Sequence, residues 1–93
     1  MRLINKDRIE EIKKAVVEVS SLSMIELETS RKHTVTPWAT IGMYLIAKEG
    51  ETADKAAAHF GRQAGIVYRV VKKIDSDIDK YQPFIDRILE RVE

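Results

Sequence analysis

Apolar residues recur at helical spacing near the start of the chain. Four of them, three or four positions apart, share one face of a helix predicted over residues 6–19: Ile9, Ile12, Val16 and Val19. Asn5 suits the N-cap position of this helix. Farther on, Ser23 and Glu26 have the spacing of a capping box, which predicts a short helix over residues 24–28. The chain is therefore expected to begin with two helices.

The most apolar segment of the chain is predicted to form a third helix. Pro37 suits its first position, and Thr36 is expected to be extended and to cap it, because the residue before a proline avoids the helical region. Gly50 ends the apolar pattern. We expect this helix at the centre of the core, where Gly42 would let another helix pack closely.

Residues 53–74 predict two helices joined by a tight glycine turn, and Thr52 is expected to cap the first of them. Ala57, Gly61 and Val67 have the spacing of a DNA-binding helix-turn-helix, in which a small residue lets the helices cross closely and a left-handed glycine ends the first helix. The second helix is expected to begin near residue 62 or 63. The predicted core positions of the unit are Ala56, Phe60, Ile66 or Val67, Val70 or Val71, and Ile74. An ordinary helical hairpin with a glycine cap fits this stretch equally well.

The end of the chain predicts one more helix, opened by Pro83. Its apolar face is formed by Phe84, Ile85, Ile88, Leu89 and Val92. Taken together, the elements predict an all-α protein. We expect a single domain over residues 1–93, folded as a compact bundle of about six helices with a helix-turn-helix at about residues 53–74.

Composition narrows the classes of protein to consider. The 93 residues are 44% hydrophobic and 33% charged, as in a folded domain. Cysteine is absent and the two histidines are far apart, so no metal site is predicted. The sequence offers no nucleophile–base pair or phosphate-binding glycine loop, and we expect neither an enzyme nor a cofactor. Without an apolar signal sequence or a segment long enough to span a bilayer, we expect a cytoplasmic protein with no membrane partner and no small-molecule substrate.

Charge is distributed unevenly along the chain. Residues 31–73 hold eight Lys and Arg against three Asp and Glu, a balance of +5. Residues 1–30 hold five against six, and residues 74–93 hold three against six, so the flanks carry −1 and −3. A basic middle between acidic flanks is what a local phosphate-binding face requires.

In this order, the elements resemble the C-terminal DNA-binding domain (domain IV) of the bacterial replication initiator DnaA, in the Trp-repressor-like helix-turn-helix superfamily. The resemblance covers nearly the whole chain and rests mostly on packing residues. The segments that carry it are Ile41-Gly42-Met43-Tyr44-Leu45, His59-Phe60-Gly61 and Lys72-Lys73-Ile74. A basic loop with Arg31 and Lys32 precedes them in the chain. It implies double-stranded DNA binding in the control of replication or transcription. No counterpart of the family's ATPase module is present, so no ATP chemistry is implied.

The sequence departs from the family where bases would be read. The family's recognition helix begins Gly-Gly-Arg-Asp-His-Thr-Thr-Val, whereas residues 61–67 read Gly-Arg-Gln-Ala-Gly-Ile-Val, and only Arg62 matches. Recognition of the initiator's own DNA site is therefore not expected. Gly65 also weakens a helix by ~1 kcal/mol relative to alanine, which argues against strong base reading.

The chemistry still permits contact with DNA. Gln63 could bind adenine, Arg62 could bind guanine or a phosphate, and the other cations could bind phosphates. The predicted DNA contacts are Arg31, Lys32, His33, Arg62, Gln63, Tyr68, Arg69, Lys72 and Lys73. The basic residues could instead form a plain solvated helix face. The alternative function is a protein-interaction adaptor that keeps the fold without binding DNA.

Overall fold

The computed structural model describes residues 6–92, which form six helices and no strands. The helices are α1 (Lys6–Ser20), α2 (Met24–Thr29), α3 (Thr36–Lys48), α4 (Ala53–Ala58), α5 (Ala64–Ser76) and α6 (Ile78–Val92). The prediction of an all-α bundle of about six helices is confirmed. The proposed cap Asn5 lies outside the described residues.

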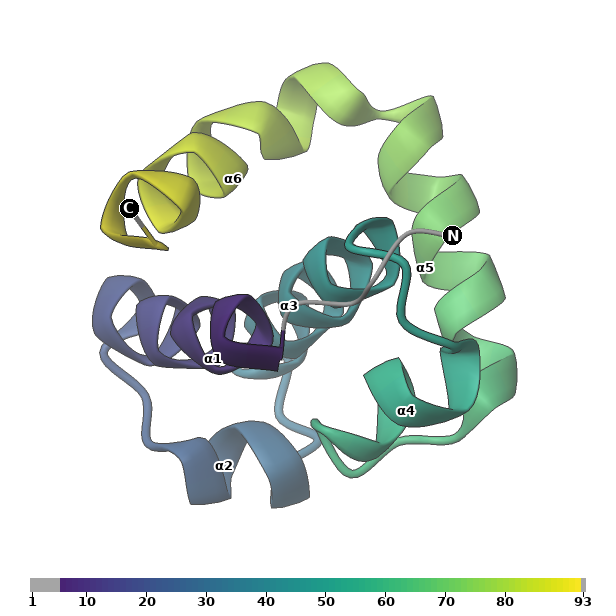
Figure 1. The fold of residues 1–93 in the computed structure, drawn as a ribbon, viewed down its shortest axis with the longest axis horizontal. Helices are drawn as coiled ribbons and strands as arrows, with labels where there is room; N and C mark the ends of the chain where they lie inside the picture. Colours follow the sequence, from purple (N-terminus) through teal and green to yellow (C-terminus); the bar gives the residue numbers. More distant parts are fainter. Residues whose placement is uncertain (1–5, 93) are drawn as a thin grey trace.

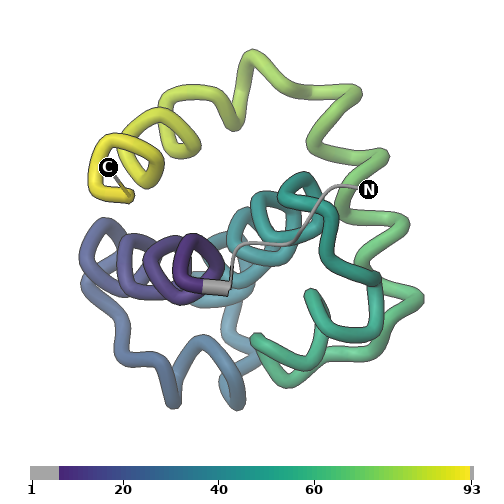
Figure 2. Tube along the Cα trace, in the orientation of Figure 1, coloured from purple at the N-terminus to yellow at the C-terminus, as the bar shows by residue number. Residues whose placement is uncertain are grey.

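Helix α3 lies at the centre and contacts each of the other helices (Figure 1). It buries residues on all sides: Ala39, Ile41, Gly42, Met43, Tyr44, Leu45 and Ile46. The first and last helices, α1 and α6, lie side by side, with the end of α6 near the end of α1 (Figure 2). A salt bridge between Glu18 and Arg91, 3.4 Å long, joins these two helices. The predicted central position of α3 is therefore confirmed.

Local capping signals predicted the starts of α2 and α4 correctly. The Ser23 hydroxyl accepts a hydrogen bond from the Glu26 amide (3.1 Å), and the Glu26 carboxylate accepts one from the Ser23 amide (3.2 Å), completing the capping box of α2. Thr52 caps α4 by accepting a bond from the Lys55 amide at 3.3 Å. These interactions span only three residues, which is why sequence spacing reveals them.

The predicted cap at Thr36 was wrong. Thr36 is already the first residue of α3, and the preceding Val35 is helical, with φ −102° and ψ −44°. The Thr36 amide and hydroxyl both donate to the carbonyl of Lys32, at 2.9 and 3.0 Å. This turn draws the chain into the helix before Pro37 and outweighs the extended preference of a residue that precedes proline.

The start of the last helix was also predicted wrongly. Helix α6 begins at Ile78 and contains Pro83, which is exposed. The buried side of α6 includes Tyr81 as well as Ile85, so burial holds the first turn in place before the proline. Because Pro83 faces solvent, water can hydrate the carbonyl that its missing amide leaves free.

No helix within residues 6–92 is long and apolar enough to cross a membrane.

Candidate nucleic-acid interface

Helix α5 divides into a buried side and an exposed side. Val67, Val70 and Ile74 are at most 6% exposed and face α3 and α4. The predicted contact residues Tyr68, Arg69, Lys72 and Lys73 are all exposed. Since the two sets alternate at helical spacing, the three cations and the tyrosine share the outer side of one helix. Within residues 6–92, no carboxylate pairs with any of these cations.

Of the two candidate core positions Ile66 and Val67, the structure buries Val67, whereas Ile66 is 39% exposed. Helix α5 also begins at Ala64, later than expected. Gln63 is the N-cap residue with an extended backbone (φ −90°, ψ 149°), and its exposed side chain makes no capping bond. Ile66 therefore lies on the exposed side of α5, beside the cations.

The turn between α4 and α5 depends on Gly61. Its φ is +64°, and the amides of Gly61 and Arg62 donate to the carbonyls of Ala58 and Ala57, the two bonds of a Schellman motif. A Cβ atom at Gly61 would also lie 2.3 Å from the carbonyl oxygen of Glu28 in α2. The predicted left-handed glycine is confirmed, and it also lets the turn pack directly on α2.

Two arginines join the basic loop to this turn. The Arg31 Nη2 donates to the Gly61 carbonyl at 2.9 Å. The half-buried Arg62 guanidinium donates to the carbonyls of Leu27, Phe60 and Ser30, the last at 3.0 Å. Burial, followed by the nearby charge of Arg31, lowers the pKa of Arg62 below its usual value. Arg62 was expected to contact DNA, but in this structure its donors bind the protein's own backbone.

The other loop residues are open to solvent. Lys32 and His33 are exposed and lie next to Arg31 in the segment between α2 and α3. Because Arg31 bonds to Gly61, this loop lies against the turn that leads into α5. The structure therefore brings together two basic segments that are about 30 residues apart in the sequence.

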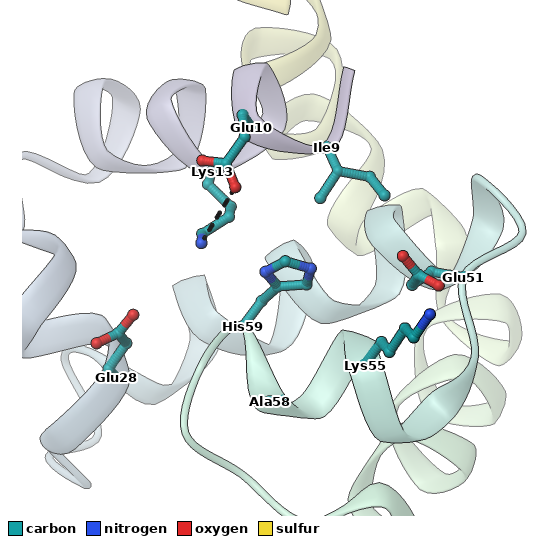
Figure 3. Close-up of a pocket in the computed structure, with 8 residues that line it drawn as sticks. All are labelled: Ile9, Glu10, Lys13, Glu28, Glu51, Lys55, Ala58 and His59. Atoms are coloured by element: carbon teal, nitrogen blue, oxygen red, sulfur yellow. Dashed lines mark ion pairs between the residues drawn. The ribbon is translucent and has the colours of Figure 1, made fainter. Parts of the chain in front are cut away.

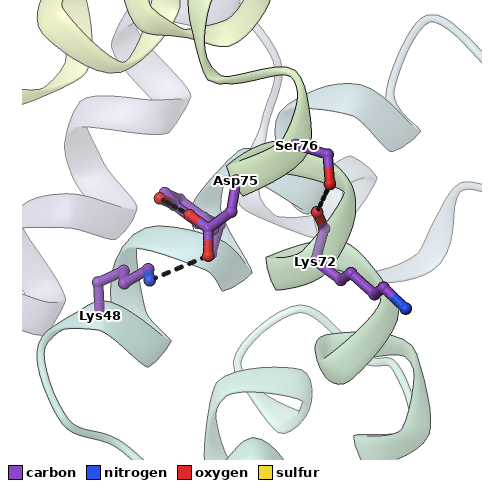
Figure 4. Close-up of polar contacts among 5 residues, drawn as sticks. Lys48, Lys72, Asp75 and Ser76 are labelled. Carbon is purple, nitrogen blue, oxygen red and sulfur yellow. Dashed lines mark hydrogen bonds and ion pairs between the residues drawn. The ribbon is translucent and has the colours of Figure 1, made fainter.

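A polar network that the sequence did not reveal fixes the far end of α5. The Tyr44 hydroxyl donates to Asp75 Oδ1 at 2.7 Å, and Lys48 Nζ donates to Asp75 Oδ2 at 3.2 Å. Burial and the hydrogen bond to Asp75 raise the pKa of Tyr44 to about 12. The bond from Tyr44 is the main cause that lowers the pKa of Asp75. Lys72 extends away from this network, on the other side of Asp75 (Figure 4).

A separate cleft lies between α1, α2 and α4, with a volume of about 610 Å³ (Figure 3). His59, at the end of α4, is half-buried and points toward α1 (Figure 3). Burial, and next the charge of Lys13, lowers the pKa of His59. Lys13 is already paired with Glu10 at 3.6 Å. The cleft mixes both signs of charge, and none of the predicted DNA contacts lines it.

No cluster of three His, Cys, Asp or Glu side chains suited to a metal ion occurs in the described part of the chain.

The comparisons with known proteins identify no relative. No family model, no curated protein and no solved structure matches this chain. The resemblance to the DnaA domain therefore stays a prediction, and the candidate interface depends on its own geometry and charge.

Proposed function

We propose that this protein binds double-stranded DNA through the exposed side of α5 and the basic loop of residues 31–33. The role we infer is that of a DnaA domain IV-like helix-turn-helix module in replication or transcription control, without ATPase activity. The observation that carries the proposal is the hydrogen bond from Arg31 to the Gly61 carbonyl at 2.9 Å. It places the loop beside the entry to α5, so that cations from both segments can reach one duplex.

The contacts divide by chemistry. Arg69, Lys72 and Lys73 are exposed, have no carboxylate partner among residues 6–92, and suit phosphate oxygens. Lys32 and His33 would contact phosphates on the loop side. Gln63 precedes the first turn of α5, and its amide can make a bidentate contact with adenine.

In this proposal Arg62 has a structural role, whereas the sequence suggested a DNA contact. Its guanidinium already donates to three backbone carbonyls, so we infer that Arg62, together with Arg31, fixes the loop against the turn while Lys32 and His33 face the DNA. Arginine suits this task because its planar group donates in several fixed directions at once.

The uneven charge supports a polyanionic partner. The segment with a balance of +5, residues 31–73, contains the loop and α5 as far as Lys73, whereas the acidic flanks contain α1, α2 and α6. Because this separation places positive potential over the proposed contact side, it would steer a duplex toward α5.

A protein-interaction adaptor remains the second candidate. It is favoured by Ile25 on α2, which is 72% exposed and lies away from the cations of α5. An isolated exposed isoleucine is common on protein surfaces, so this observation carries less weight than the joined basic segments.

The test is fluorescence anisotropy with a mixed pool of short labelled duplexes at 50 and 200 mM salt. Binding through about six phosphate contacts should weaken by about a thousandfold over this range. The double variant Arg69→Ala/Lys72→Ala should bind more weakly and reduce the slope of log K against log salt by about 1.8, or about 0.9 for each lost phosphate contact.

Lys14→Ala/Arg87→Ala is the matched control, since it removes one lysine and one arginine that are exposed on α1 and α6. This control should retain both affinity and salt slope. Absence of binding by the unaltered protein at 50 mM salt would reject the proposal and favour the adaptor.

A further inference from the structure

Gly65 differs from the other three glycines of the chain in having no internal reason to be glycine. A Cβ atom at Gly42 would lie 2.4 Å from the Phe60 ring, and one at Gly61 would lie 2.3 Å from the Glu28 carbonyl. Gly50 has a φ of +101°. At Gly65 the backbone has no positive φ, and nothing lies within 4 Å of the position that a Cβ atom would occupy. As far as the chain's own packing is concerned, alanine would fit and would favour the helix.

The position of Gly65 is the outermost part of the proposed interface. Gly65, Arg69 and Lys72 follow one another at steps of four and three residues, so they form a line along α5 opposite the buried Val67 and Val70. This line starts at the end of α5 that lies next to the basic loop.

Exposed apolar side chains lie on both sides of this glycine. Ile66 is 39% exposed and Tyr68 is 71% exposed, and both belong to the first turns of α5. The open surface at Gly65 thus has exposed apolar side chains on both sides and is followed along α5 by a row of cations. Base edges with methyl groups and sugars, bordered by phosphates, present the complementary pattern in a major groove.

We propose that duplex DNA makes its closest approach to the protein at the backbone of Gly65, with Ile66 and Tyr68 in contact with the groove on either side. The missing side chain lets the helix enter the groove, as glycine does wherever a backbone must approach a ligand closely. This inference rests on the proposed function and adds the point of contact. It also changes the interpretation of Gly65. In the sequence alone, its low helix propensity argued against base reading, whereas here the missing side chain permits close approach to DNA.

The experiment measures stability and DNA affinity in the same variants, Gly65→Ala and Gly65→Met. Because the site is open, Gly65→Ala should raise the melting temperature, by up to about 4–8 °C. Its affinity for the duplex pool at 50 mM salt should nevertheless fall by about tenfold, the equivalent of one lost base contact. Gly65→Met should bind more weakly still, because its side chain is longer.

Ser21→Gly is the control for a stabilising change away from the interface. Ser21 follows α1 and has a φ of +62°, which glycine adopts more readily. This variant should also be more stable than the unaltered protein, and its DNA affinity should be unchanged.

The outcomes separate the inference from the proposed function. If the unaltered protein binds no duplex at 50 mM salt, both are rejected. If the unaltered protein binds, and Gly65→Ala and Gly65→Met bind equally well, the inference fails while the proposed function stands. A loss of affinity accompanied by a lower melting temperature would also overturn the inference, because the position would then not be open.

Discussion

Helices α3 and α5 have the same length, 13 residues, and pack against each other, yet their sequences serve different purposes. Helix α3 buries seven residues and has other helices around it, whereas α5 buries three and exposes most of the others. Their glycines show the same contrast, since Gly42 is pressed against Phe60 and Gly65 has open space around it. Changes in α3 should therefore affect folding, and changes on the outer side of α5 should affect binding.

The same substitution in both helices gives the sharpest test of this contrast. Ile46→Ala in α3 should lower the free energy of unfolding by about 2–5 kcal/mol, because it leaves a cavity in a fully buried site. Ile66→Ala in α5 should change it by only about 0.5 kcal/mol, as at other exposed sites. Urea unfolding monitored by circular dichroism measures both values. Equal losses would show that α5 is as closely packed as α3.

Substitution of Arg62 tests whether this residue stabilises the fold or binds DNA. Arg62→Lys keeps the charge but cannot reach three carbonyls, so the free energy of unfolding should fall by about 1–3 kcal/mol. DNA binding should weaken with an unchanged salt slope, because no phosphate contact is removed. Arg69→Lys serves as the control and should change stability by only about 0.5 kcal/mol. A fully stable Arg62→Lys variant with a reduced salt slope would instead assign Arg62 to the DNA.

The network that joins α3 to α5 predicts a smaller, pH-dependent effect. Tyr44 has its pKa raised to about 12 in the folded state, so the free energy of unfolding should decrease as the pH rises from about 10 toward 12. Asp75 has a lowered pKa, so its contribution should be present above about pH 4 and lost as the pH falls through the lowered value.

Tyr44→Phe removes the hydroxyl whose pKa burial and the bond to Asp75 raise, and with it the main cause of the lowered pKa of Asp75. At neutral pH it should lower the free energy of unfolding by about 1 kcal/mol. Urea midpoints measured from pH 3 to 12 should then show less alkaline destabilisation than in the unaltered protein. Both proteins keep Tyr68 and Tyr81, so the difference between them comes from Tyr44. Identical pH profiles for the two proteins would show that the network does not couple α3 to α5.

The sequence alone predicted the features that depend on near neighbours along the chain. The capping box at Ser23, the Thr52 cap and the left-handed Gly61 each involve residues a few positions apart, and all three are present. The central position of α3 also followed from its apolar run. Local propensity misled at Thr36 and Pro83, where a preceding turn and the burial of Tyr81 outweighed it.

The candidate interface required the tertiary structure. The sequence indicated which residues are basic, but it could not show that Arg62 binds carbonyls of Leu27 and Ser30 while Arg69 remains free of carboxylate partners among residues 6–92. Exposure of Ile66 and open space around Gly65 likewise followed from where α5 begins and how it packs. Helix periodicity is set within one turn, whereas the partner of a long side chain is set by segments about 30 residues away, which only folding brings together.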